Sequence, residues 1–371
     1  MSQCRVHLIA AARPNFMKVA PLWHALTATT EFAPVLIHTG QHYDINMSDA
    51  IFADLRLPAP DHHLGVGSGS HAEQTARVMV AYERLATDDR PDWLVVVGDV
   101  NSTAACAMAA AKLAIPIVHL EAGLRSRDRD MPEEINRLVT DAVTDVFWTP
   151  SEDADFNLLD EGVPADRISR VGNIMIDSLE MVRGGIEAAG FRADLGLGDA
   201  PYGVVTLHRP SNVDDLQQLT ALVDALVDAQ QRLPLVFSLH PRTLARLTEA
   251  GLLGRLDASG VRLLEPVPYV NFMNLVVGAT AIITDSGGIQ EETTYLGIPC
   301  LTLRENTERP ITVSHGTNRL VRAETLVAEL EAALGRRGAP QAPPEHWDGR
   351  TALRCVEDLR VRNGSGRRRT R

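Results

Sequence analysis

The stretch WLVVVGDVNSTAACAMAAAKLAIPIVHL (93–120) carries the pattern on which the fold prediction rests. It places two short apolar runs, 93–98 and 115–120, on either side of a segment with the length of a helix. Each run has the length of a strand that is buried on both faces. A strand, a helix and a second strand in this order are typical of a parallel sheet covered by helices.

The same alternation continues along most of the chain and falls into two series. Between the apolar runs lie amphipathic segments such as Ile135, Leu138, Val139 and Ala142, which recur at helical spacing. We therefore predict two doubly wound α/β domains that face each other across a cleft. The first series of runs lies at 6–11, 35–39, 93–98, 115–120 and 145–149, and the second at 202–207, 235–239, 261–264, 281–284 and 300–303.

The predicted domain boundary lies in a glycine-rich stretch. A chain of 371 residues has room for two or three domains of about 150 residues each. Between the two series, residues 172–201 contain repeated glycines and a proline. We predict an N-terminal domain over 1–172, a C-terminal domain over 173–363, and a disordered basic tail, GSGRRRTR, over 364–371.

Charge and composition exclude several classes of protein. The net charge is −12, whereas a protein that binds duplex nucleic acid needs a basic face. No apolar stretch approaches the roughly 18 residues of a membrane span, and the N-terminus lacks the pattern of a signal peptide. The four cysteines are scattered, which indicates reduced thiols in a cytoplasmic protein. The histidines show no zinc-type spacing, so we predict no metal.

Carboxylates follow two of the predicted strands and open a helix. Asp99 comes directly after one strand and Glu121 after the next, while Glu133 lies in the first turn of a predicted helix. Arg137 follows Glu133 by one turn, so the two share a face. A negative charge near the N-terminus of a helix is favourable because of the helix dipole, so the position of Glu133 also has a purely structural explanation. Because ligands bind at the carboxyl ends of parallel strands, these groups are candidates for acid–base work around one pocket.

The segment TDSGGIQEE (284–292) predicts a phosphate site. A strand runs into Ser286, Gly287 and Gly288, and a helix follows. Glycines allow close approach to the backbone, and free N–H groups at a helix start attract anions. Ser286 is also suited to capping the helix, and both interpretations can hold. No Walker A motif or GxGxxG follows the first strand, so we expect no dinucleotide cofactor, and without GxSxG an acyl nucleophile is a poor interpretation of Ser286.

Basic side chains recur at predicted strand ends. Several such groups around one cleft indicate a clamp for a diphosphate. Together with the carboxylates of the first series they predict a nucleotide-sugar site. These groups are Arg13, Lys18, His208, Arg209, His240, Arg242 and the arginines of RENTER (304–309).

Taken in order, the motifs resemble the non-hydrolysing UDP-N-acetylglucosamine 2-epimerases over essentially the whole chain except the tail. The resemblance implies a GT-B-like fold of two Rossmann-like domains with the substrate in the cleft between them. It also implies a cytoplasmic homodimeric isomerase of cell-surface polysaccharide biosynthesis that interconverts UDP-GlcNAc and UDP-ManNAc without cofactor or metal. The motifs are ARPNFMKVAP (12–21), GQHYD (40–44), GDVNST (98–103), HLEAGLRSRDRDMPEEINR (119–137), GN (172–173), TLHRPSN (206–212), SLHPRT (238–243), EPVPY (265–269), TDSGGIQEE (284–292) and LRENTERP (303–310).

The resemblance also implies roles for individual residues. Asp99, Glu121 and Glu133 match the family's acid–base carboxylates, and His208 matches the histidine beside the diphosphate. The other matching positions are Ser286, Gly287 and Gly288 in the phosphate turn, Glu292 at the ribose, Arg13, His240 and Phe272 elsewhere in the nucleotide site, and Lys18 and Arg137 within matching motifs.

The chain departs from the family pattern at several points. It reads ARPN at 12–15 where many members read TRPE, and Ile311 stands where many members have Glu. In some bacterial members a second UDP-GlcNAc binds as an activator beside a QHxxM-like segment. Gln41 and His42 are present here, but Asp44 and GVGSGSH (65–71) differ from that pattern. These differences leave open an epimerase for a related UDP-diacetamido-uronic acid.

Three other functions are compatible with the same motifs. A hydrolysing 2-epimerase would release ManNAc and UDP from the same site. A GT-B glycosyltransferase would also place a phosphate at a turn in the second domain, but it has no need of so many carboxylates around the sugar. A non-catalytic nucleotide-sugar sensor would not need intact candidates at all three carboxylate positions.

Overall fold

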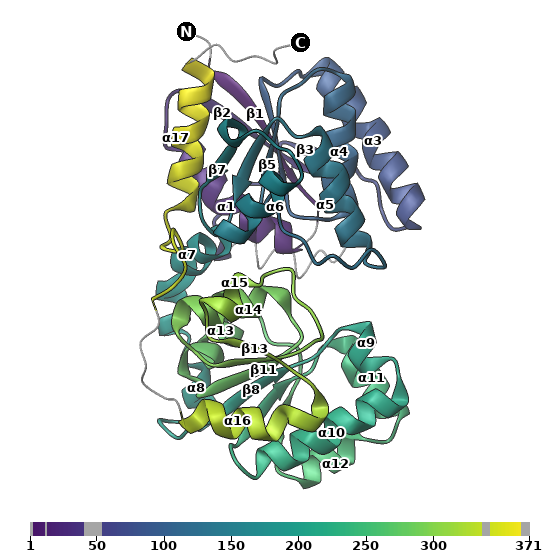
Figure 1. The fold of residues 1–371 in the computed structure, drawn as a ribbon, viewed down its shortest axis with the longest axis vertical. Helices are drawn as coiled ribbons and strands as arrows, with labels where there is room; N and C mark the ends of the chain where they lie inside the picture. The colour runs from purple at the N-terminus through teal and green to yellow at the C-terminus, as the bar shows by residue number, and fades with distance from the viewer. Residues whose placement is uncertain (1–2, 12, 41–53, 336–341, 365–371) are drawn as a thin grey trace. The chain divides into compact units, whose positions relative to one another are not determined.

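The computed structural model describes residues 3–11, 13–40, 54–335 and 342–364. The chain forms two compact units (Figure 1). The first unit contains Met1–Met181 together with Glu345–Arg371, and the second contains Val182–Pro344. Each is an α/β unit built on a parallel sheet, as the alternation of apolar runs predicts.

The first unit is built on a sheet with the strand order β3-β2-β1-β4-β5-β6-β7. Every neighbouring pair is parallel. The strands are β1 (Cys4–Ala10), β2 (Phe32–His38), β3 (His62–His63), β4 (Trp93–Val97), β5 (Ile117–Leu120), β6 (Val146–Thr149) and β7 (Ile168–Arg170). The helices are α1 (Arg13–Thr27), α3 (His71–Asp88), α4 (Asn101–Lys112), α5 (Pro132–Val143), α6 (Glu152–Asp160), α7 (Ile174–Ala188), which continues past the division between the units, and α17 (Thr351–Gly364).

The stretch 93–120 forms β4, α4 and β5 in the core of the first unit. All five residues of β4 are buried, as expected for a central strand with helices on both faces. The helix that follows, α4, buries alanines along most of its length and contacts both α3 and α5. Small side chains allow these helices to pack close together, which holds the β4–α4–β5 segment tightly in place.

The second unit repeats the architecture with the strand order β10-β9-β8-β11-β12-β13, again all parallel. Its core joins α10 and α16 to the sheet. The strands are β8 (Gly203–Thr206), β9 (Leu235–Ser238), β10 (Arg262–Leu264), β11 (Ala281–Thr284), β12 (Cys300–Leu303) and β13 (Asn318–Val321). The helices are α8 (Phe191–Asp194), α9 (Pro210–Val213), α10 (Leu216–Gln230), α11 (Pro241–Glu249), α12 (Leu253–Ala258), α13 (Tyr269–Gly278), α14 (Gly287–Leu296), α15 (Ile311–Ser314) and α16 (Leu326–Gly335).

All ten apolar runs of the sequence are strands in the structure, and the two-domain α/β fold class is confirmed. The short strands β3 and β7 and the strand β13 were not predicted. β3 and β7 have two and three residues, and β13, with the sequence NRLV, begins with two polar residues and has no continuous apolar run. A sequence reading based on apolar runs passes over such strands.

The division of the chain differs from the predicted boundaries of 1–172 and 173–363, because the C-terminal helix returns to the first unit. In Figure 1 α17 lies beside α1, which it contacts. The Asp177 carboxylate accepts hydrogen bonds from the backbone N–H groups of Thr351 and Ala352 at the start of α17. The Trp148 indole N–H donates to Asp358 at 2.7 Å. Of the predicted tail 364–371, Gly364 ends α17, and the rest lies outside the described residues.

The helix predicted from Ile135, Leu138, Val139 and Ala142 is present as α5, but its apolar stripe is not the buried face. Ile135 is 43% exposed. The buried residues are polar instead, namely Glu134, Arg137, Thr140 and Asp141. The side chains of Glu134, Arg137 and Asp141 are buried because each is paired with an opposite charge, and Glu134 and Asp141 also accept from backbone N–H groups of neighbouring loops.

Candidate active site

The first group of candidate residues lies at the carboxyl edge of the first unit's sheet. β4 and β5 are adjacent parallel strands in which Val97 pairs with Leu120, so Asp99 and Glu121 leave the sheet at the same edge. Gly98, the residue before Asp99, has a positive φ of 66°. A Cβ at Gly98 would lie 3.2 Å from Lys18 Nζ and 3.4 Å from Glu121 Oε2. The glycine therefore leaves the space that these two side chains need.

Glu121 is held in place by both its side chain and its backbone. Its carboxylate forms an ion pair with Lys18, and both side chains are buried. Its φ of 69° is in the left-handed region, which is unfavourable for a residue with a side chain. The backbone N–H groups of Glu121 and Ala122 both donate to the carbonyl of Trp148 on the next strand. Such strain persists where the surroundings fix it, and it is typical of functional positions.

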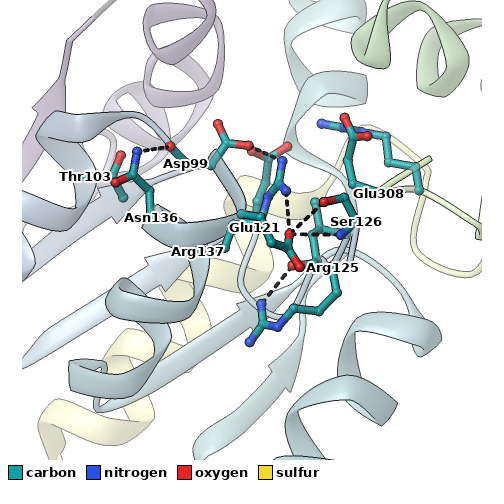
Figure 2. Close-up of polar contacts among 12 residues, drawn as sticks. Asp99, Thr103, Glu121, Arg125, Ser126, Asn136, Arg137 and Glu308 are labelled. Atoms are coloured by element: carbon teal, nitrogen blue, oxygen red, sulfur yellow. Dashed lines mark hydrogen bonds and ion pairs between the residues drawn. The ribbon is translucent and has the colours of Figure 1, made fainter. Parts of the chain in front are cut away.

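Asp99 is joined to α5 by Arg137, as Figure 2 shows. The other arm of the Arg137 guanidinium donates to Glu134 at 2.9 Å. Glu134 also accepts from the backbone N–H groups of Ser126 and Arg127, each at 2.9 Å. Burial alone would raise the pKa of Glu134, but these hydrogen bonds and Arg137 outweigh it and lower the pKa. Glu134 is thus an ionised anchor for Arg137.

Glu133 occupies a different environment from its neighbour. It is exposed in the first turn of α5, and its side chain makes no hydrogen bond or ion pair with another residue of the described ranges. The structure therefore brings Lys18, Asp99, Glu121 and Arg137 to the carboxyl edge, with Glu133 at the solvent side of the same helix start. Sequence reasoning chose Glu133 and missed Glu134, because two consecutive glutamates look alike until the packing of the helix is known.

A buried His119–Asp141 pair supports the two loops that carry Asp99 and Glu121. His119 Nδ1 lies 2.6 Å from Asp141, and its Nε2 lies 2.9 Å from the carbonyl of Gly98. Asp141 also accepts from the Gly123 N–H at 3.2 Å and pairs with Arg125 at 2.8 Å. Burial would raise the pKa of Asp141, but His119 and Arg125 lower it. One carboxylate thus connects the loop after β4 with the loop after β5.

The second group lies at the carboxyl edge of the second unit's sheet, where β11 runs into α14. Ser286 is the residue before the helix, yet its side chain makes no capping hydrogen bond, so the capping interpretation is wrong. The N–H groups of the first helical turn are therefore not satisfied by Ser286. A Cβ at Gly288 would meet nothing within 4 Å, which makes this side of the turn open. The geometry suits a bound anion.

Beneath the turn lies a buried group of charges. A Cβ at Gly287 would lie 2.8 Å from Glu308 Oε1 and 2.9 Å from Arg309 Nη1. Glu308 pairs with Arg309 at 2.6 Å and with Arg304 at 2.8 Å, and Arg309 also pairs with Glu291 at 2.7 Å. Burial would raise the pKa of Glu308, but the two arginines hold it far below the usual range. The sequence indicated a basic cluster here but not the carboxylates that hold it.

The remaining candidates of the second unit lie around the same edge. His208 follows β8, the neighbour of β11, and its Nδ1 lies 2.9 Å from the buried Asp285. The His240 ring centroid is 5.7 Å from that of His208. Glu292 is buried in α14 and accepts from the Tyr269 hydroxyl at 2.7 Å, and Phe272 lies one turn after Tyr269 on α13. Arg13 opens α1 in the first unit.

Neither a membrane span nor a metal cluster is found in the part of the chain that the structure describes. No described helix is both long and apolar enough to cross a membrane. No group of three or more His, Cys, Asp or Glu among the described residues is arranged to hold a metal ion. Gln41, His42 and Asp44 lie outside the described residues.

Comparison with known proteins identifies the family. The model of the UDP-N-acetylglucosamine 2-epimerase family matches residues 24–360. The chain is 40% identical over 364 residues to a UDP-N-acetylglucosamine 2-epimerase of Methanocaldococcus jannaschii, covering 96% of this chain and 98% of that protein. This chain belongs to the UDP-N-acetylglucosamine 2-epimerase family.

A solved structure and a second similar protein complete the comparison. A crystal structure of the M. jannaschii UDP-GlcNAc 2-epimerase in complex with UDP-GlcNAc and UDP superposes with a TM-score of 0.87 at 38% identity, covering 96% of this chain and 99% of that chain. The chain is also 38% identical over 338 residues to a UDP-2,3-diacetamido-2,3-dideoxy-D-glucuronate 2-epimerase of Pseudomonas aeruginosa, covering 90% of this chain and 93% of that protein.

The two adjacent glutamates of α5 give a test of the site's construction. Glu134→Gln removes a buried charge that Arg137 needs, so we expect a loss of about 3–5 kcal/mol in the unfolding free energy of the first unit. Glu133→Gln, the matched control, changes an exposed side chain and should cost less than about 0.5 kcal/mol. All four tryptophans lie in the first unit, so their fluorescence during urea unfolding reports that unit alone.

The loss of unfolding free energy caused by Glu134→Gln should also depend on pH. Because the folded-state pKa of Glu134 is lowered, its contribution is complete above the unfolded-state pKa and is lost as the pH falls through the folded-state value. The difference between wild type and variant should therefore shrink toward acid. Equal costs for Glu133→Gln and Glu134→Gln would contradict the assignment of Glu134 as the anchor.

Proposed function

We propose that the chain interconverts UDP-N-acetylglucosamine and UDP-N-acetylmannosamine by eliminating UDP and adding it back with inversion at C2. The observation that supports this most is the pair of carboxylates, Asp99 and Glu121, at one sheet edge, each beside a buried cation. The proposal places the sugar at that edge and UDP at the Ser286–Gly288 turn of the second unit.

The chemistry of the sugar explains why elimination comes first. The hydrogen on C2 is not next to a carbonyl group, so a carboxylate at pH 7 removes it very slowly. Breaking the bond between C1 and the UDP oxygen builds positive charge at C1 and makes that hydrogen acidic. Loss of the proton then gives a 2-acetamidoglucal, and a proton delivered to the opposite face of C2 followed by return of UDP to C1 inverts the centre.

The second unit supplies groups for the departing diphosphate. Negative charge grows on the β-phosphate as the C1–O bond breaks, and donors fixed in advance stabilise it best. The N–H groups at the start of α14 and the imidazole of His208 are such donors. In the proposal Glu292 binds the ribose hydroxyls, and Arg13, His240 and Phe272 complete the nucleotide site.

The first unit supplies the acid–base groups. The reaction needs one group on each face of C2, and Asp99, Glu121 and Glu133 are the three candidates. Lys18 forms an ion pair with Glu121 and Arg137 forms one with Asp99, and these pairs hold both carboxylates at the sheet edge. Glu133 has no protein partner within the described residues and so remains available to a substrate.

A second candidate substrate is a UDP-diacetamido-uronic acid. It is favoured by the likeness to the P. aeruginosa epimerase, which matches this chain over nearly its full length. The same elimination would apply, because C2 and the leaving UDP are unchanged. A hydrolysing outcome, with release of ManNAc, would share the first half of the reaction.

We also propose that the chain acts as a cytoplasmic homodimer. The outward apolar stripe of α5 supports self-association, because Ile135 and Val80 of α3 are 43% and 46% exposed. Both line a surface groove of about 570 Å³ between α3 and α5. A second copy of the chain covering this face would remove these side chains from water.

The catalytic assignment predicts activity and its loss in three variants. Purified protein incubated with UDP-GlcNAc should give UDP-ManNAc, observed by the anomeric proton signals in NMR spectra. Asp99→Asn, Glu121→Gln and Glu133→Gln should each lose at least about a hundredfold in turnover, the usual scale for acid–base groups. UDP binding, measured by calorimetry, should persist in all three. Normal turnover in all three variants would place the chemistry elsewhere.

The phosphate turn can be tested without disturbing the protein around it. Gly288→Ala adds a methyl group on the open side of the turn, where no protein atom lies within 4 Å. We expect UDP affinity to fall at least tenfold, about 1.4 kcal/mol, because the methyl group occupies the anion's place. Gly254→Ala in α12 is the matched control, since its Cβ also meets nothing within 4 Å. Unchanged calorimetric affinity in Gly288→Ala would refute the assignment.

A further inference from the structure

Asp285 lies between β11 and the Ser286–Gly288 turn at the start of α14. β8 and β11 are adjacent parallel strands in which Thr206 pairs with Thr284, so the segments carrying His208 and Asp285 leave the sheet side by side. Asp285 is fully buried, whereas the His208 side chain is 40% exposed. The carboxylate therefore lies behind the histidine, on the protein side.

Four donors converge on the Asp285 carboxylate. Oδ2 accepts from the backbone N–H groups of His208 at 3.0 Å and Arg209 at 2.9 Å, and from the Asn212 amide at 3.1 Å. Oδ1 lies 2.9 Å from His208 Nδ1 and shares the His208 backbone N–H with Oδ2, at 3.1 Å. Burial would raise the pKa of Asp285, but His208 and the other donors outweigh it and lower the pKa. An ionised carboxylate only accepts, so the hydrogen of the fourth contact belongs to Nδ1 of His208.

His240 is held in the opposite arrangement. Its Nδ1 accepts a hydrogen bond from the backbone N–H of Arg242 at 3.2 Å, so its ring hydrogen lies on Nε2. Burial and the neighbouring His208 lower the pKa of His240, which keeps this ring neutral at pH 7. Two histidines whose ring centroids lie 5.7 Å apart thus carry their hydrogens on different nitrogens.

We propose that Asp285 is a positioning residue that fixes the hydrogen of His208 on Nδ1 and turns Nε2 toward the ligand. This rests on the proposed function in that it takes the UDP diphosphate as the ligand of His208. A second proton on the ring then lies on Nε2, where it donates to a β-phosphate oxygen while Asp285 balances the ring's charge. Without Asp285 the ring would be free to place its hydrogen on either nitrogen.

The donor arrangement predicts what an asparagine at this position would do. Asparagine has one acceptor oxygen and an NH₂ group in place of the second oxygen. Three donors face the Oδ2 side, so the amide oxygen of Asp285→Asn should take that position. Its NH₂ group then faces His208 Nδ1, which must become an acceptor. The ring hydrogen should move to Nε2.

The tautomer of the His208 ring is measured by NMR in the ¹⁵N-labelled full-length chain with UDP added. Long-range ¹H–¹⁵N spectra at about pH 9, where an imidazole is neutral, distinguish the two tautomers. The signals of His208 are assigned by their absence in His208→Gln. We expect the Nδ1–H form in the wild type and the Nε2–H form in Asp285→Asn. Asn212→Ala, which removes one donor and leaves the carboxylate, should keep the Nδ1–H form.

Turnover provides a second measurement. Asp285→Asn should lose at least about a hundredfold in kcat, with a change in KM below about threefold, because no carboxylate then balances the charge of the doubly protonated ring that donates to the departing phosphate. An Nε2–H form in the wild type would overturn the proposal, even if Asp285→Asn failed to fold. An unchanged tautomer in folded Asp285→Asn would overturn it too. A wild type inactive on UDP-sugars that still shows the Nδ1–H form would refute the proposed function and leave the tautomer assignment standing.

Discussion

The pairing of buried opposite charges is the constraint on which the candidate groups of each unit depend. An isolated charge is very costly to remove from water, so the buried charges named at the two sheet edges are placed against partners. Lys18 is placed against Glu121, Arg137 against Asp99 and Glu134, and the arginines near the phosphate turn against Glu308. The partners fix the positions of the functional groups before any substrate arrives, which is what electrostatic preorganisation requires.

This constraint also explains the unusual burial of α5. Its polar face lies inside because Glu134, Arg137 and Asp141 satisfy one another and the neighbouring loops, while its apolar stripe is left at the surface. An ordinary surface helix would do the reverse. The helix thus positions groups at the carboxyl edge of the sheet rather than filling the hydrophobic core.

The sequence predicted the fold well because continuous apolar runs are a strong signal of buried parallel strands. It also placed Asp99 and Glu121 at one edge, since that follows from strand order alone. It did not identify Glu134, Asp285 or Glu308 as anchors, because each is defined by a partner on another element that only the packing brings near. The return of α17 to the first unit was missed for the same reason: the contacts of Asp177 with Thr351 and Ala352 span the whole second unit in sequence.

The central claim is that UDP leaves C1 and returns to it while C2 is inverted, and positional isotope exchange tests this most directly. UDP-GlcNAc is prepared with oxygen-18 in the bridge between C1 and the β-phosphate, and the protein is allowed to convert it to UDP-ManNAc. The account predicts that oxygen-18 moves into non-bridging positions of the β-phosphate, because the freed phosphate can rotate before UDP returns. Inversion at C2 with all of the oxygen-18 retained in the bridge would contradict it.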